Sequence, residues 1–241
     1  MLTSGAYMRA KLYIESHSKE KKELESRQEE IKTGPCITIS RQTGAAAGEI
    51  AELIIEYIKS HSKRPDREWA IFDKKLIERV IEDHKLPTVI SDYLTEKKHR
   101  FVESIMNEIF GIHPSPISLV RKTSKTLLQL AQIGYCIIVG RASNIVLKRL
   151  PNTYHVRIIA PLPTRIKQVM KIYHFDSEEE AKRFIKKEDE NRTKYVKQFF
   201  YKDIDDPSLY DLVINSEFYT REQVAKIIAQ SAMIKLSEYF D

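Results

Sequence analysis

The sequence has few of the features that mark secreted or membrane proteins. Only two cysteines, Cys36 and Cys136, occur in 241 residues. Each opens an apolar run, so we expect buried, inert thiols and no disulfide or metal site. No run approaches the roughly 18 apolar residues of a membrane span, and the N-terminus lacks the apolar core of a signal peptide. These absences predict a cytoplasmic protein that does not bind membranes.

Glycine and proline are also scarce, with seven and nine residues. This composition excludes a fibrous or low-complexity chain, and 42% hydrophobic and 31% charged residues are typical of a soluble globular protein. The length is enough for one sizeable core. The net charge of +6 suits phosphorylated ligands or nucleic acid, but it is too small per residue to select between them.

The most informative stretch joins a β-branched run at 36–40 to an apolar-periodic helix that opens at Glu49. A strand, a tight loop and a helix start aim backbone N–H groups and the positive helix terminus into one hollow, which predicts a phosphate-binding loop. The motif G-x-x-x-x-G-K-[ST] needs a Gly-Lys pair, which this chain lacks. The predicted loop consists of Gly44, Ala45, Ala46, Ala47, Gly48 and Glu49, with Ala47 and Gly48 at the positions of the lysine and the hydroxyl residue.

Strands and helices are expected to alternate along the rest of the chain. The strand-like runs after the first are 69–72, 136–139, 154–160 and 209–215. The helical patterns after the first are 74–84, 92–110, 115–132, 142–150, 162–173, a charged helix from 177 and 220–239. This order predicts an α/β fold with a parallel, doubly wound five-stranded sheet in three α/β/α layers. Ligands are expected at the carboxyl edge of that sheet.

Residues 1–34 are expected to be a charged helical extension of the main domain at 35–241. The pattern predicts a solvated helix and a linker, because Lys, Glu, Ser and Gln dominate and apolar positions are sparse. Its narrow apolar face leaves two further possibilities: the helix lies across the domain, or it reaches a partner chain and forms a homo-oligomer.

Arginines gather at or just after the predicted strand ends. They are Arg41, Arg79, Arg141 and Arg165, and Asp73 ends the second strand. The planar guanidinium binds phosphate with two parallel hydrogen bonds and keeps its charge, so such a cluster indicates two phosphorylated ligands meeting in one cleft. Judged singly, the helical Arg79 and Arg165 are typical of solvated surface arginines. Asp189 and Arg192 share a helix face, for which a local ion pair is the simplest interpretation.

Six segments resemble, in order, the bacterial cytidylate kinase-like proteins, a divergent branch of the P-loop nucleoside monophosphate kinases. They are ITIS-RQTGAAAGEIAE, FDKKLIERV, CIIVGRAS, HVRIIAPLPTRI, IKKEDENR and DPSLYDLVIN. The resemblance covers about residues 35–230. It implies a core sheet, a monophosphate-binding part at about 73–134 and a mobile helical lid at about 177–206.

The resemblance also implies roles for individual residues. Arg79 and Arg141 match arginines that hold the acceptor monophosphate, and Asp73 lies at the start of the same segment. The lid residues Asp189 and Arg192 match positions that contact the nucleobase or sugar and a phosphate. Arg165 matches the arginine at a helix start near the donor.

The implied activity is transfer of the ATP γ-phosphoryl to a nucleoside monophosphate, with Mg²⁺ entering with ATP. CMP or dCMP is the first candidate acceptor, although Ala142 replaces the Asp that helps recognise the nucleoside. The loop departs from the family's Gly-Ser-Gly-Gly-Arg as well, so Arg41 or a lid arginine has to supply the missing cation. One alternative is a catalytically silent nucleotide-sensing module that signals through the N-terminal helix. A less favoured one is a nucleic-acid-binding protein that uses the basic, aromatic segment at 186–201.

The lid is expected to be mobile without ligand because it is too charged to pack permanently. Its cations are Arg183, Lys186, Lys187, Arg192, Lys194 and Lys197. Closure over two bound phosphates would bring them into a cleft from which water is expelled.

Overall fold

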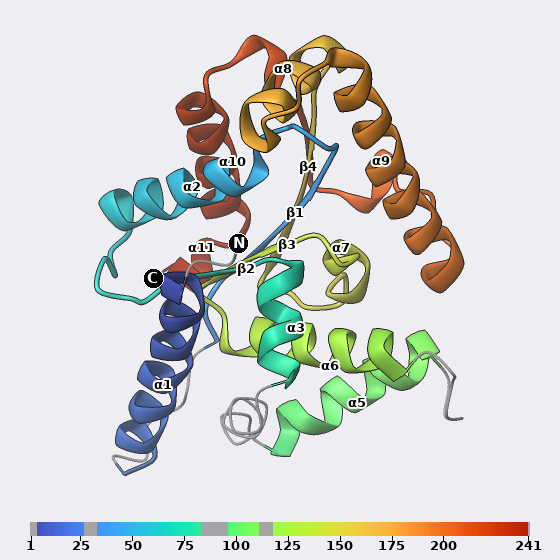
Figure 1. Cartoon of the computed structure of the whole chain (residues 1–241). Coiled ribbons are helices and arrows are strands. Elements are labelled where there is room, and N and C mark those ends of the chain that lie inside the picture. Colours follow the sequence, from blue (N-terminus) through green and yellow to red (C-terminus); the bar gives the residue numbers. More distant parts are fainter. Residues whose placement is uncertain (1–3, 27–32, 83–95, 111–117, 241) are drawn as a thin grey trace.

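The computed structural model describes residues 4–26, 33–82, 96–110 and 118–240. Five parallel strands form one sheet in the order β2-β3-β1-β4-β5 (Figure 1). The strands are β1 (Cys36–Arg41), β2 (Ala70–Phe72), β3 (Cys136–Val139), β4 (Thr153–Ile159) and β5 (Leu212–Asn215). The predicted fold class is thus confirmed.

Helices connect the strands and cover both faces of the sheet. They are α1 (Ser4–Ser26), α2 (Ala47–His61), α3 (Lys74–Glu82), α5 (Glu96–Phe110), α6 (Ser118–Ile133), α7 (Ser143–Val146), α8 (Leu162–Tyr173), α9 (Glu178–Phe200), α10 (Arg221–Lys235) and α11 (Ser237–Phe240). Helices α2 and α10 pack together on one side, with α6 and α7 on the other (Figure 1). Short 3-10 turns, η1 (Pro207–Leu209) and η2 (Ser216–Phe218), flank β5.

The central strands are buried because helices cover both of their faces, and β3 is apolar along its whole length. β3 is completely buried, and β1 is buried from Cys36 to Ser40. Cys36 and Cys136 lie opposite each other in the pairing of β1 with β3. Both are buried free thiols, as predicted.

Several predicted boundaries differ from the observed ones. The helix expected at 142–150 is only Ser143–Val146, because Leu147 leaves the helical conformation. β5 starts at Leu212 and not at 209, because Pro207 begins a 3-10 turn there. The last predicted helix is interrupted at Leu236. The predicted helical residues 83–84, 92–95 and 115–117 lie outside the described part of the chain.

The N-terminal helix packs against the rest of its own chain. Ala10, Tyr13 and Ile14 of α1 are each 1% exposed. The Tyr13 ring meets Phe72 of β2 edge-on, and its hydroxyl donates to the carbonyl of Gly134. The interpretation of α1 as a solvated helix is therefore wrong for this face, which lies across the domain. A separate extension at 1–34 and a homo-oligomer stay predictions.

The helix expected to be too charged to pack has a buried apolar stripe. Ser177 caps its start by accepting from the Glu180 N–H. Ala181 and Ile185 pack in a small cluster with α8, and Phe200 near the other end joins the main core. The expectation that charge prevents packing is thus wrong for this face of α9. Mobility of the lid without ligand stays a prediction.

Candidate phosphate-binding site at the carboxyl edge

The loop between β1 and α2 has the strained backbone of a compact anion-binding turn. Gly44 has φ of +85° and Ala46, at the N-cap of α2, has φ of +53°. A Cβ added to Gly44 would lie 2.6 Å from the carbonyl oxygen of Arg165. Only glycine fits there, because the loop presses against the start of α8 and its backbone is left-handed.

The first turn of α2 offers backbone groups and no catalytic side chain. Ala47 is buried, and Gly48 is exposed with nothing within 4 Å of where a Cβ would be. The Ala46 side chain makes no capping hydrogen bond, so the helix start has no capping acceptor of its own. Glu49 is turned to Arg221, with which it forms an ion pair, and accepts a hydrogen bond from Gln168. An anion at this helix start would therefore meet N–H groups only.

The carboxylate of Asp189, on helix α9, is bound to this loop. Its Oδ1 accepts from the backbone N–H of Thr43 at 2.8 Å and from the Thr43 hydroxyl at 2.6 Å. Arg165 donates to Oδ2 at 2.7 Å and Arg192 to Oδ1 at 3.0 Å. Arg192 also donates to the Thr43 hydroxyl oxygen. One carboxylate thus takes up the donors that a phosphate at this loop would use.

Arg165 is held at the junction of β4 and α8. Its side chain is buried, and Nε donates to the carbonyl of Ala160 at 2.9 Å. The guanidinium therefore lies between the end of β4 and the loop, with Nη1 left for Asp189 or an anion in its place. The interpretation of Arg165 as an ordinary surface arginine is wrong, because its exposure is only 9%.

Arg41, the last residue of β1, has no ion pair or hydrogen bond among the described residues. A Cβ added to Gly140 would lie 2.2 Å from Arg41 Nη1, which places the guanidinium against the end of β3. Burial, followed by the nearby Arg192, lowers the pKa of Arg41 to about 10, against opposing effects of Asp73 and Glu188. Arg41 is thus a cation at neutral pH that lacks a matching carboxylate.

The predicted acceptor side contains one described arginine. Arg141 follows β3 with φ of +58°, pairs with Glu78 of α3, and lies 5.9 Å from the centre of the Tyr195 ring on the lid. Its Nε is buried without a hydrogen-bond partner among the described residues. Asp73 accepts from the Leu76 N–H at 2.8 Å and so caps α3. The side chain of Arg79 lies outside the described residues.

Sequence reasoning missed Arg157, which is 4% exposed in the middle of β4. It donates to Ser40 Oγ at 2.9 Å and pairs with Asp205. A cavity of about 60 Å³ lies beside it, and Arg41 and Arg192 are also in its lining. The signal was an arginine followed by two isoleucines inside a predicted strand. Thr43 was missed as well, because a single hydroxyl in a loop has no diagnostic spacing.

The aromatic residues of the basic segment mostly face inward. Phe200 is buried against Phe110, and Tyr195 packs against both Phe199 and Phe200. Tyr201, 88% exposed, is the clear exception. Bases of a nucleic acid need exposed rings to stack on, so this arrangement does not favour that alternative.

The described ranges contain neither a metal-binding cluster nor a membrane-spanning helix. Within them, no three His, Cys, Asp or Glu side chains group closely enough to hold a metal ion. No helix there has the length and apolarity needed to cross a bilayer.

Part of the chain is similar to proteins known as cytidylate kinases. The model of the cytidylate kinase-like family matches residues 36–218. A cytidylate kinase of Methanosarcina barkeri is 35% identical over 95 residues, which are 38% of this chain and 51% of that protein. One of Pyrococcus horikoshii is 25% identical over 155 residues, 64% of this chain and 77% of that protein. The chain thus spans about half the length of the first of these relatives.

A solved structure has the same fold. The crystal structure of an uncharacterised protein from Eubacterium ventriosum is 22% identical, with a TM-score of 0.64. The match covers 83% of this chain and 98% of that one. At this identity the likeness supports the fold alone.

Proposed function

Because the chain belongs to the cytidylate kinase-like family, we propose that it transfers the γ-phosphoryl group of ATP to a nucleoside monophosphate, with CMP or dCMP the first candidate. One observation carries the proposal. Thr43, Arg165 and Arg192 all donate hydrogen bonds to the same carboxylate, that of Asp189, beside the loop. These groups, with the nearby Arg41, form a preorganised set of donors for phosphate oxygens.

On the donor side, the triphosphate would replace Asp189. The Thr43 N–H and the guanidinium of Arg165 already point at an anionic oxygen, so a phosphate can take the place of the carboxylate without rebuilding the loop. Arg41 adds positive charge that no described carboxylate pairs with. Displacement of Asp189 costs its hydrogen bonds, which ties ATP binding to movement of α9.

Mg²⁺ would arrive with ATP and be held mainly by the phosphates and water. Gly48 has no side chain for the metal, and the hydroxyl of Thr43 is engaged with Asp189 and Arg192. The arginines therefore have to neutralise the charge that a P-loop lysine would otherwise share.

On the acceptor side, Arg141 would bind the monophosphate together with Arg79. The buried, unpartnered Nε of Arg141 is one donor that an incoming phosphate could satisfy. Glu78 now pairs with this arginine and would have to release it. The acceptor site is thus also neutralised internally by a carboxylate.

A catalytically silent nucleotide-sensing module is the second candidate. The hydrogen bonds of Asp189 favour it as well, because they hold α9 against the loop. If ATP breaks these bonds and releases α9, the protein acts as a switch even without phosphoryl transfer. The absent lysine and hydroxyl at Ala47 and Gly48 point the same way.

A coupled assay of ADP formation with ATP–Mg²⁺ and a panel of monophosphates separates the two. Turnover with CMP or dCMP above the other monophosphates supports the kinase. Arg192→Ala, purified in the same way, controls for a contaminating kinase, because contaminant activity would survive the substitution. No turnover, together with a rise in melting temperature on addition of ATP, supports the silent module.

A further inference from the structure

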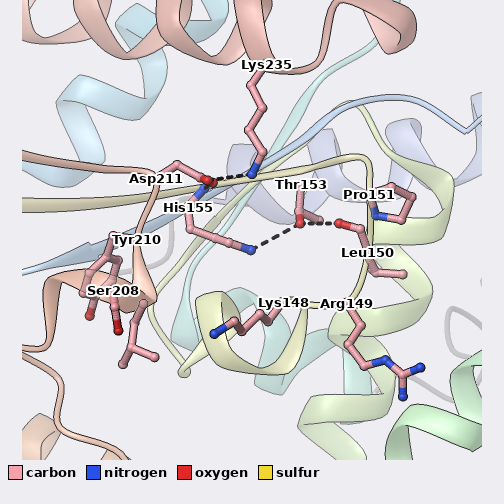
Figure 2. Close-up of a pocket in the computed structure, with 11 residues that line it drawn as sticks. Lys148, Arg149, Leu150, Pro151, Thr153, His155, Ser208, Tyr210, Asp211 and Lys235 are labelled. Carbon is pink, nitrogen blue, oxygen red and sulfur yellow. Dashed lines mark hydrogen bonds and ion pairs between the residues drawn. The ribbon is translucent and has the colours of Figure 1, made fainter.

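A second cavity lies at the opposite edge of the sheet from the phosphate loop. Its volume is about 320 Å³, in the range of small-molecule sites. Residues that precede β4 and β5 line it, and Lys235 from the end of α10 reaches in (Figure 2). β4 starts at this cavity with Thr153 and ends at Ile159 beside the loop, six residues later. A strand of that length spans about 20 Å at roughly 3.3 Å per residue, so the two sites are separate.

Positive charge dominates the lining. The lining contains three cations, Lys148, Arg149 and Lys235, and one carboxylate, that of Asp211. Lys235 donates to Asp211 Oδ1 at 2.6 Å, and the backbone N–H of His155 donates to Oδ2 at 2.8 Å. Both carboxylate oxygens are thus occupied. The charges of the other two cations are not balanced inside the cavity.

Those two cations differ in their partners. Arg149 forms an ion pair with Glu108, outside the cavity, and both side chains are about half exposed. Such exposed pairs contribute little and exchange readily. Lys148 has no ion pair among the described residues. An anion in the cavity would gain one free ammonium and one guanidinium that is only loosely engaged.

The floor of the cavity is polar, buried and uncharged. Thr153 and His155 are 1% and 6% exposed. Thr153 donates to the Leu150 carbonyl at 2.7 Å and lies 3.3 Å from His155 Nε2, while His155 Nδ1 lies 2.8 Å from the Thr38 hydroxyl (Figure 2 shows the first two contacts). Burial, together with Lys235 and Lys148, lowers the pKa of His155 to about 4 against the opposing effect of Asp211. His155 is therefore neutral at pH 7 and does not compete with the lysines for a ligand.

We propose that this cavity binds a small phosphorylated metabolite, whose phosphate is held by Lys148, with Arg149 at the rim, and whose uncharged part rests between Tyr210 and Pro151. The aromatic and pyrrolidine rings supply an apolar wall beside the cationic rim. A cavity of this size encloses a small phosphoester but not a polymer. Nucleic acid would instead need cations along an open groove.

Pyrophosphate is the probe, and the His155 ring signals in NMR spectra of the full chain are the readout. They sit under the proposed phosphate and about 13 Å from the loop end of β4, four strand residues away. A saturable shift of these signals therefore measures binding in the cavity even if pyrophosphate also binds the loop. We expect such a shift, with affinity at least tenfold weaker in Lys148→Glu. The less disruptive Lys148→Gln should lower the affinity in the same direction.

Lys226→Glu is the matched control, because Lys226 is an exposed lysine on α10 outside the cavity and the substitution changes the net charge equally. Wild-type affinity in this variant supports the proposal. It is overturned if the His155 signals do not respond, if Lys148→Glu and Lys226→Glu bind alike, or if a short oligonucleotide displaces pyrophosphate at far lower concentration than a sugar phosphate does.

Discussion

The two edges of the sheet both gather cations, but they neutralise them differently. At the carboxyl edge Asp189 and Glu78 form ion pairs with three arginines, and a cavity of about 60 Å³ lies beside them. At the amino edge Asp211 neutralises only Lys235, and a cavity of about 320 Å³ stays open. The carboxyl edge is expected to bind two ligands, yet it is the edge where ion pairs within the chain already engage the arginines.

This difference shows that a cluster of cations does not by itself identify a site that can bind an anion without rearrangement. Ligands at the carboxyl edge must compete with carboxylates that already hold the donors, so binding there is coupled to rearrangement of α9 and α3. An anion at the amino edge displaces only water and the exposed partner of Arg149. Binding there should leave the fold unchanged.

The largest expected effect concerns Arg192, which joins the lid to the loop. Arg192→Ala should lower turnover by about 100-fold or more, since it removes a cation that acts on charge developing in the transition state. ATP affinity should change little, as measured by calorimetry. Lys194→Ala, an exposed cation on the same helix, is the control and should keep wild-type turnover. If Arg192→Ala and Lys194→Ala have equal turnover, Arg192 has no special role in phosphoryl transfer.

Arg141 tests the acceptor half of the same edge. Arg141→Ala should weaken CMP binding by roughly 1.5–3 kcal/mol, about 10- to 100-fold, because charge-assisted hydrogen bonds to the phosphate are lost. Glu78→Gln should tighten binding by freeing the arginine. Calorimetric titration measures both, with Lys226→Ala, at an exposed position of α10 outside both sites, as control. Unchanged affinity in Arg141→Ala would refute this role.

At the amino edge, His155 should make stability depend on pH. Its pKa is about 4 in the folded chain, below the ordinary 6.5, so the unfolded chain binds more protons in between. The contribution of His155 to the free energy of unfolding is fully present above pH 6.5 and is lost as the pH falls toward 4. Between pH 7 and 5 the loss from this group is about 2 kcal/mol. Urea unfolding of His155→Gln should show a shallower pH slope, whereas His61→Gln, at an exposed position, should keep the wild-type slope.

The smallest effect separates two glycines of one loop. Gly48→Ala should raise the free energy of unfolding by about 0.5 kcal/mol, since the position is helical and a Cβ meets only open space. Gly44→Ala should lower it, because φ is +85° and the Cβ would meet the Arg165 carbonyl. Urea unfolding measures both changes. A gain in stability for Gly44→Ala would contradict the tight packing of the loop against α8.

The expected fold followed closely from local patterns. Alternation of buried runs with helical periodicity placed all five strands, and the span of α8 at Leu162–Tyr173 was predicted to the residue. Boundaries failed where a single turn decided them, as at Pro207 before β5. The strand-end position of Arg41 and Arg165 was likewise readable, because parallel strands deliver their carboxyl ends to one edge.

The tertiary contacts of these side chains could not be predicted from the sequence. Asp189 and Arg192 do form the expected local ion pair, but Asp189 also reaches Thr43, 146 positions away, and Arg165. The apolar face of α1 looked too narrow to pack, yet Tyr13 is buried against β2. In both cases the contact depends on how distant elements dock, which spacing along one helix does not encode.

The sequence by itself determined the order of strands and helices, the cations near the strand ends and the missing loop lysine, because periodicity and residue identity are local properties. Only the tertiary structure decided which carboxylate neutralises which arginine, where Arg157 lies, and that a cationic cavity opens below β4 and β5. The physical reason is that charges interact over a few ångströms in space, and packing alone sets which residues come that close.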